Sequence, residues 1–386
     1  MSKAKDKQKG MVLEELLRAF FLRAGFFVIR GVPISFEGDD LTDVDLWLYE
    51  RPTGTTRRVQ IVDIKYRQRP KAVERLLWTR GLVDALDVDG AYVATTDKRK
   101  SLRKIAKKLD LSIIDGTDLQ RIRESPNILF PERLTDEELI AMLREVDKGR
   151  RKRELQEARK EIIGCLSDGF GVSSVVRSLE SFSRLGRAVV SAHPGSEGAV
   201  AAGRLAYLAA AIACQSLDYV SIAAAFRSAD ERRELLLNAV RYGASDRDEG
   251  MRNLRLAVGL IEKYAPSGPG AARAVETGLR SDLDAIPAEI VADQAVRLLK
   301  DGQLFAVGRE LEAASYSRLC PTFDQLGLHA KSLTGAFLDY ASVNRETFAS
   351  AWKKSKESPR KDAAPESPEN ARQEVISPSL FDSPKS

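Results

Sequence analysis

The chain has 386 residues, of which 43% are hydrophobic and 30% charged, enough for packed cores in two or three domains. Its three cysteines and two histidines lie far apart, so their spacing assembles neither a zinc ligand set nor a disulfide framework. The basic N-terminus lacks the apolar core of a signal peptide, and Arg204 interrupts the Ala-rich stretch 199–213 before it reaches membrane-spanning length. We therefore expect a soluble, cytoplasmic protein.

Positive charge is concentrated in the first third of the chain. The net charge is +5, and residues 1–125 carry 25 Lys and Arg against 19 Asp and Glu, so the remainder is nearly neutral. Basic side chains gain affinity for phosphates by displacing counterions, which makes a polyanionic partner plausible for this part. A solvated surface explains a charge of this size about as well.

The first 125 residues alternate helix and strand. After a basic arm (1–10), apolar residues between Val12 and Ala24 recur at i, i+3, i+4 and i+7, which predicts an amphipathic helix that Gly25 ends. β-rich runs and turn residues then predict three strands, a helix, a strand, a helix and a strand, at 26–32, 44–49, 59–65, 70–87, 91–95, 98–109 and 111–114. This order indicates an α/β domain over residues 11–125, with a mixed sheet flanked by helices.

Beyond residue 125 the composition changes to segments rich in Ala, Leu, Arg and Glu. We expect a charged linker or helix at 126–160 and an all-α domain at 161–352, with breaks at 169–171, 193–195, 242–245, 266–270 and 286–287. The tail, 353–386, contains four Ser-Pro steps and few apolar residues, which predicts disorder.

Two neighbouring predicted strands carry acids, Asp45 on the first and Asp63-Ile64-Lys65 on the second. Because side chains alternate along a strand, Asp63 and Lys65 share a face, and pairing of the strands brings Asp45 to it. Two clustered carboxylates repel each other unless a cation lies between them, and hard oxygen ligands select Mg²⁺ or Mn²⁺. The pattern predicts a metal site that cuts phosphodiesters. A structural salt bridge between Asp45 and Lys65 is the alternative.

These motifs resemble those of the PD-(D/E)xK nuclease superfamily, and within it the Mrr-like restriction endonucleases, over about residues 10–120. Glu14 matches the family's first-helix Glu before a Gly-aromatic strand start, here Gly25-Phe26, and Asp45 lies in the family's acidic-apolar-Asp-apolar context. Asp63-Ile-Lys65 matches the third motif. The later segments Ala91-Tyr-Val-Ala-Thr-Thr and Leu111-Ser-Ile-Ile-Asp-Gly-Thr-Asp-Leu are similar to the family's apolar strand ending in Thr and its closing Leu-Ile-Asp-Gly.

The resemblance implies a restriction-endonuclease-like fold and a Mg²⁺- or Mn²⁺-dependent DNA endonuclease that acts in bacterial restriction or phage defence. It implies that Asp45, Asp63 and the carbonyl of Ile64 hold the metal, with Glu14 contributing through water. Lys65 would orient or deprotonate the attacking water and stabilise the transition state. For Glu14 the alternative is a solvent-facing helix acid, with Glu15 as its rival.

The following helix departs from the family pattern. Where relatives often carry Gln, this chain has Glu74, with Arg75 and Arg80 nearby, so we expect no helper residue there.

Candidate nucleic-acid contacts lie on the basic helix and after the third strand. The cations are Lys98, Arg99, Lys100, Arg103, Lys104 and Arg67. Such a face suits contacts to the phosphate backbone, although a solvated helix face is the alternative. In the tail, Leu380 and Phe381 faintly resemble the peptides that bind the bacterial sliding clamp, but the usual leading Gln is missing.

Two other functions stay open. The first alternative to a DNA endonuclease is a nuclease-fold module that binds nucleic acid or protein without cutting, with the helical domain as its working part. The second is an RNA-directed nuclease. No motif in the helical domain chooses between a homo-oligomer contact, recognition of modified DNA and binding of a defence-system partner.

Overall fold

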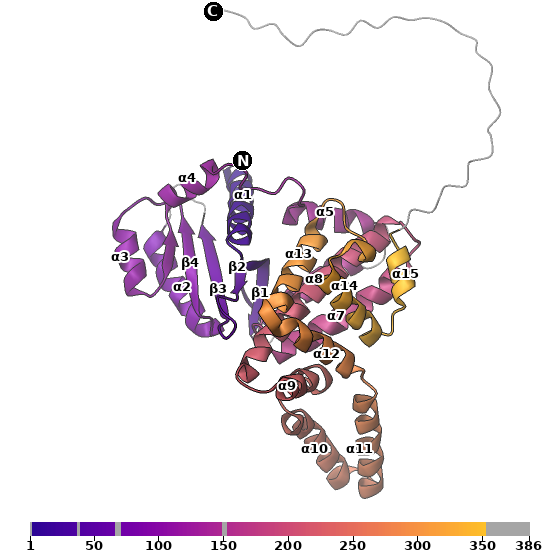
Figure 1. Ribbon diagram of the computed structural model, residues 1–386. Coiled ribbons are helices and arrows are strands. Elements are labelled where there is room, and N and C mark those ends of the chain that lie inside the picture. Colours follow the sequence, from indigo (N-terminus) through magenta and orange to yellow (C-terminus); the bar gives the residue numbers. More distant parts are fainter. Residues whose placement is uncertain (1, 37–38, 66–70, 149–152, 353–386) are drawn as a thin grey trace, which may run out of the picture. The chain divides into compact units, whose positions relative to one another are not determined.

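The computed structural model describes residues 2–36, 39–65, 71–148 and 153–352 (Figure 1). Helix α1 (Ser2–Arg23) precedes three strands, β1 (Phe27–Phe36), β2 (Asp39–Glu50) and β3 (Arg58–Lys65). They are followed by α2 (Ala72–Leu86), β4 (Gly90–Thr95), α3 (Ser101–Lys108), β5 (Ser112–Ile114) and α4 (Gly116–Glu124). The predicted order of elements is confirmed. Helix α4 was not predicted, and the backbone of residues 2–10 of the predicted arm belongs to α1.

The five strands form one mixed sheet in the order β1-β2-β3-β4-β5. The first three are antiparallel neighbours, whereas β3, β4 and β5 run parallel because helices α2 and α3 connect them. Apolar side chains of α1 and α4 pack with one set of strand residues, which includes Leu46 and Val62. Those of α2 and α3 pack with another set, which includes Trp47 and Ile61. The sheet is therefore covered by helices on both faces.

The rest of the described chain is helical, as predicted. Its α-helices are α5 (Asp136–Val146), α6 (Glu154–Gly164), α7 (Val172–Ser191), α8 (Glu197–Val220), α9 (Ala229–Tyr242), α10 (Arg247–Tyr264), α11 (Gly268–Asp284), α12 (Ala288–Leu299), α13 (Gln303–Tyr316), α14 (Leu328–Tyr340) and α15 (Arg345–Ser350). The predicted breaks at 169–171, 193–195 and 286–287 fall between successive helices, whereas 242–245 begins on the last residue of α9 and 266–270 runs into the first turn of α11. The predicted tail, with Leu380 and Phe381, lies outside the described residues.

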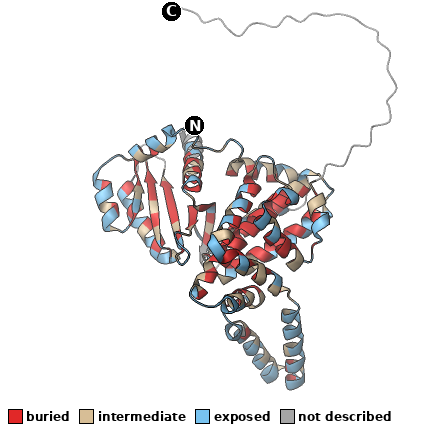
Figure 2. Ribbon diagram, viewed as in Figure 1, coloured by how far each residue is buried: buried red, intermediate tan, exposed pale blue. Residues whose placement is uncertain are grey.

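Helix α8 forms the centre of the helical region. The segment Glu197–Ala224 is long and apolar enough to cross a membrane by composition, but 89% of its most apolar window is buried inside the fold. Figure 2 shows this burial. The buried guanidinium of Arg204 donates to the carbonyl of Ser315 in the last turn of α13 and to that of Arg318 just after this helix, both at 2.9 Å. The apolar composition of α8 is thus that of a core helix.

The sheet and the helices share one hydrophobic core. The segment expected to be a charged linker or helix, 126–160, contains α5 and the start of α6, and its Leu139, Leu143 and Leu155 are buried in that core. The predicted boundary therefore does not separate two independently packed cores. Regular apolar spacing within the charged segment was the signal for these helices.

A buried carboxylate joins the sheet to α8. Asp218 is fully buried and accepts hydrogen bonds from the Tyr49 hydroxyl (2.7 Å), Arg51 Nη1 (3.1 Å) and Arg57 Nη2 (3.0 Å). Two arginines on one carboxylate compensate for its desolvation, so this cluster depends on all its members.

Candidate functional site

Asp45 and Asp63 lie where β2 and β3 separate. The antiparallel ladder ends at the pair Leu46↔Val62, and the next residue on each strand is one of the two aspartates. Here the Asp45 carboxylate accepts a hydrogen bond from the backbone N–H of Ile64 at 2.6 Å. The structure therefore brings Asp45 beside the Asp-x-Lys motif.

The surroundings of Asp45 favour its protonated form. Burial raises the pKa of Asp45 to about 6, against the lowering effect of the Ile64 N–H. The carboxylate of Glu14 raises this pKa further, while the cations of Arg75 and Lys65 lower it. Glu14 and Lys65 are thus close enough to act electrostatically on Asp45.

Asp63 is held by Arg75 of helix α2. Arg75 Nε donates to Asp63 Oδ2 at 2.8 Å and its Nη2 donates to Oδ1, a bidentate pair. The Asp63 side chain is 8% exposed and that of Arg75 is 28% exposed. The sequence had offered an Asp45–Lys65 salt bridge as the alternative to a metal site. Among the ion pairs of the described residues, the pair at this place is Asp63–Arg75 instead.

Sequence reasoning named Arg75 but gave it no partner. The buried residues Ala72, Leu76 and Thr79 follow the i, i+4, i+7 spacing of the inward face of α2, and Arg75 occupies the i+3 position of that face. A cation at an inward position of a helix that follows the motif strand requires an acidic partner. That was the signal available in the sequence.

Glu14 of α1 forms an ion pair with Arg30 of β1. It accepts from Arg30 Nε at 2.9 Å and forms an ion pair with Arg30 Nη2 at 2.5 Å. Arg30 also pairs with Glu137 of α5 at 2.7 Å and approaches Glu15 at 3.5 Å. The helix acid is therefore part of a charge cluster that joins α1, β1 and α5, and is not solvated alone.

The oxygen atoms at this site are of the type that binds a hard divalent cation, but they are not arranged as a complete ligand set. Asp45, Asp63 and the carbonyl of Ile64 offer the oxygen ligands that Mg²⁺ and Mn²⁺ prefer. Within the described residues, however, no three His, Cys, Asp or Glu side chains lie close enough to hold a metal together. Because Arg75 takes both oxygens of Asp63, a cation fits this site only when Arg75 has moved away.

The basic segment near α3 is exposed, but part of its charge is compensated. Arg99 pairs with Asp97 at 2.6 Å, and Arg103 pairs with Asp115 at 2.7 Å and with Asp118 at 2.8 Å. Lys98 donates to Gln120 at 3.3 Å. The side chains of Lys100 and Lys104 are exposed, and Arg67 lies outside the described residues. The lysines are therefore the better-placed contacts for a polyanion.

Asp115 and Gly116, the Asp-Gly of the closing motif, have structural roles at the start of α4. Asp115 caps α4 by accepting from the backbone N–H groups of Thr117 (2.8 Å) and Asp118 (3.1 Å). A Cβ at Gly116 would collide with the backbone of Thr96. This resemblance to the family thus reflects how β5 leads into α4.

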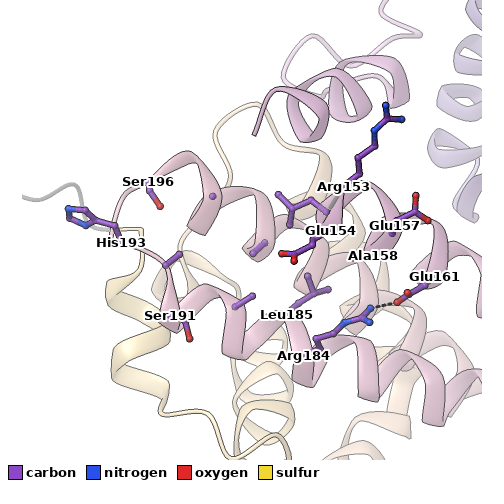
Figure 3. Close-up of a pocket in the computed structure, with 15 residues that line it drawn as sticks. Arg153, Glu154, Glu157, Ala158, Glu161, Arg184, Leu185, Ser191, His193 and Ser196 are labelled. Atoms are coloured by element: carbon purple, nitrogen blue, oxygen red, sulfur yellow. Dashed lines mark hydrogen bonds and ion pairs between the residues drawn. The ribbon is translucent and has the colours of Figure 1, made fainter. Parts of the chain in front are cut away.

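A wide cavity lies elsewhere, between α6, α7 and the start of α8 (Figure 3). Its volume is about 1060 Å³, and Figure 3 shows Arg184 in an ion pair with Glu161 on its wall. The other charged or polar side chains around it include Arg153, Glu154, Glu157 and His193. None of the residues that line this cavity belongs to the predicted site.

Comparisons with known proteins add nothing to these observations. No protein-family model matches the chain, and no similar protein was found among curated proteins or among solved structures. Proposals about activity therefore depend on the geometry and the motifs described above.

Proposed function

We propose that the chain is a divalent-metal-dependent DNA endonuclease with a restriction-endonuclease-like N-terminal domain of the PD-(D/E)xK superfamily. The observation that carries this proposal is the meeting of Asp45 and Asp63 at the point where β2 and β3 separate, with Lys65 two residues further along β3. Elements that are far apart in sequence, α1, β2, β3 and α2, direct charged groups toward this one place.

Asp45, Asp63 and the Ile64 carbonyl would hold the cation, which when bound supplies Lewis-acid activation of a phosphate and of a water. Asp45 must lose its proton to act as a ligand, and because its pKa is raised to about 6, it does so only as the pH rises through about 6. Lys65 presents an ammonium that can donate to a non-bridging phosphate oxygen and stabilise the charge that develops there. Arg75, released from Asp63, is a second donor to phosphate at the same place.

DNA would approach through the exposed lysines near α3, Lys100 and Lys104, whose contacts to phosphates carry no sequence information. A role in bacterial restriction or phage defence follows from the motif resemblance, and the cytoplasmic location is the expectation drawn from the sequence. Choice of target would then belong to the helical region, whose core is continuous with that of the sheet.

A second function is favoured by one observation, the bidentate Asp63–Arg75 pair. An arginine that permanently neutralises the motif acid would leave a nuclease-fold module that binds nucleic acid or protein without cutting. An RNA-directed nuclease would use the same residues as a DNA nuclease, so the substrate has to be tested directly.

Cleavage tests separate these functions. Supercoiled plasmid, linear duplex, single strands and RNA are incubated with the full chain in Mg²⁺, in Mn²⁺ and in EDTA, beside Asp63→Ala and Asp43→Ala variants. We expect metal-dependent DNA cleavage that Asp63→Ala abolishes and Asp43→Ala, an exposed acid on the neighbouring strand, preserves. Cleavage of RNA alone would favour the RNA-directed enzyme. Binding without cleavage of any substrate would favour the module that does not cut.

A further inference from the structure

Helices α10 and α11 form a hairpin with little support from the rest of the fold. They pack on each other, and their main other neighbour is α9. Among the side chains described, α10 buries only Met251 and α11 buries only Gly268 and Ala272. Figure 2 shows both helices almost entirely exposed. Helices of this length are marginal in water without an apolar face that packs, so this hairpin lacks the stabilisation that the other helices receive.

One face of α10 exposes large apolar side chains in a regular row. Leu256 is 65% exposed, Leu260 52% and Tyr264 70%, and they follow one another at intervals of four residues. Arg252, also exposed, begins the same row one interval earlier. Residues at i and i+4 are neighbours on a helix surface, so these four side chains form one continuous stripe.

Gly259 lies on the same face, three residues after Leu256. A Cβ at this position would meet nothing within 4 Å, so packing inside this chain does not require a glycine. A glycine inside a helix lowers its stability relative to alanine, but it allows another backbone to approach closely. Gly259 therefore leaves room for a close approach beside the two exposed leucines.

We propose that the α10 face, defined by Arg252, Leu256, Gly259, Leu260 and Tyr264, binds the α10 face of a second copy of this chain. The order of the stripe is self-complementary. When two α10 helices run antiparallel about a two-fold axis near position 258, each Leu256 packs on Leu260 of the second copy. Each Arg252 then lies on the ring of the second copy's Tyr264, where a guanidinium is attracted to an aromatic face.

This interface is small, and it does not depend on the proposed nuclease activity. The α10 face runs from Arg252 to Tyr264, so the contact spans about 18 Å at a rise of about 1.5 Å per residue. Such a patch is below the size of a tight permanent interface, and we expect dissociation in about the micromolar range.

Sedimentation velocity of the full chain from about 1 to 100 μM, a range chosen to span this dissociation, tests the proposal. We expect a reversible dimer that Leu256→Glu and Leu260→Glu each weaken at least about tenfold, because each buries a charge at the seam. Leu319→Glu is the matched control, since Leu319 is 88% exposed and lies outside the hairpin. It should leave the dimer unchanged.

A second variant guards against simple loss of folding. Gly259→Gln raises helix propensity and so keeps α10 folded, but its side chain blocks close approach. We expect an unchanged helical circular dichroism signal and loss of the dimer. A wild-type chain that stays monomeric at every concentration, or a dimer that persists in Leu256→Glu and Gly259→Gln, overturns the proposal.

Discussion

The ion pair between Arg75 and Asp63 provides the sharpest prediction about the site. Both oxygens of Asp63 accept from the guanidinium, so a metal ion can use this carboxylate only after the pair has opened. Bidentate charge-assisted pairs contribute about 1.5 to 3 kcal/mol, and the 28% exposure of Arg75 places this one near the lower end. About 1.4 kcal/mol corresponds to a factor of ten in affinity.

Arg75→Gln should therefore increase the affinity for Mn²⁺ about tenfold, because the competing cation is removed. Isothermal titration of the full chain with MnCl₂, without nucleic acid, measures this affinity independently of cleavage. Arg80→Gln is the control, since Arg80 lies on the same helix and pairs at 2.7 Å with Asp84 at the surface. It should leave the affinity unchanged.

Two results would refute this reasoning. If Arg75→Gln binds Mn²⁺ more weakly than wild type, the arginine positions Asp63 for the metal and does not compete with it. If Asp63→Asn binds Mn²⁺ as wild type does, this carboxylate is not a ligand at all. Urea unfolding of each variant should accompany the titrations, so that a loss of folding is recognised as such.

Three further predictions concern buried charges. Burial raises the pKa of Asp45 to about 6, so the stability that its protonated form contributes is present below about pH 4 and lost as the pH rises through 6. Asp45→Asn should flatten the fall in urea unfolding free energy between pH 4 and 7 by about 2 to 3 kcal/mol, and an unchanged profile would contradict the raised pKa. Asp218→Ala leaves Arg51 and Arg57 without their carboxylate and should lower the unfolding free energy by about 3 to 5 kcal/mol; a loss below about 1 kcal/mol would show that this cluster does not join the sheet to α8. Arg204→Met leaves the carbonyls of Ser315 and Arg318, at the C-terminal end of α13, without a donor and should lower the unfolding free energy by about 2 to 4 kcal/mol. A melting temperature equal to that of wild type would contradict this prediction.

Local signals in the sequence predicted the N-terminal fold. β-branched runs bounded by Gly, Pro and Asp predicted the strands, and alternation along them placed Asp63 and Lys65 together on β3. Helix α4 was not predicted because it has nine residues and little apolar content. Asp115 and Asp118 form a capping box at its start, and this pair was a signal in the sequence for the beginning of a helix.

What the sequence could not predict are partners that are distant along the chain. Tyr49 meets Asp218 across 169 residues, and Arg18 meets Glu312 across 294. Such pairs depend on how the helices pack on the sheet, which no periodicity encodes. The same limit explains why the helical region was expected as a separate domain, when its side chains complete the core around Trp47 and Ile61.

The central claim is that the end of β3 carries a site for metal-dependent phosphodiester cleavage. Its most direct test is the single-turnover rate of plasmid nicking in Mg²⁺ by the wild-type chain, Lys65→Ala and Lys71→Ala. Lys65→Ala should slow nicking by about 100-fold or more, because it removes a charge donor to the transition state. Lys71 is exposed and pairs with Glu74, so Lys71→Ala should nick at the wild-type rate. Nicking by Lys65→Ala at the wild-type rate, or no nicking by the wild-type chain, would contradict the claim.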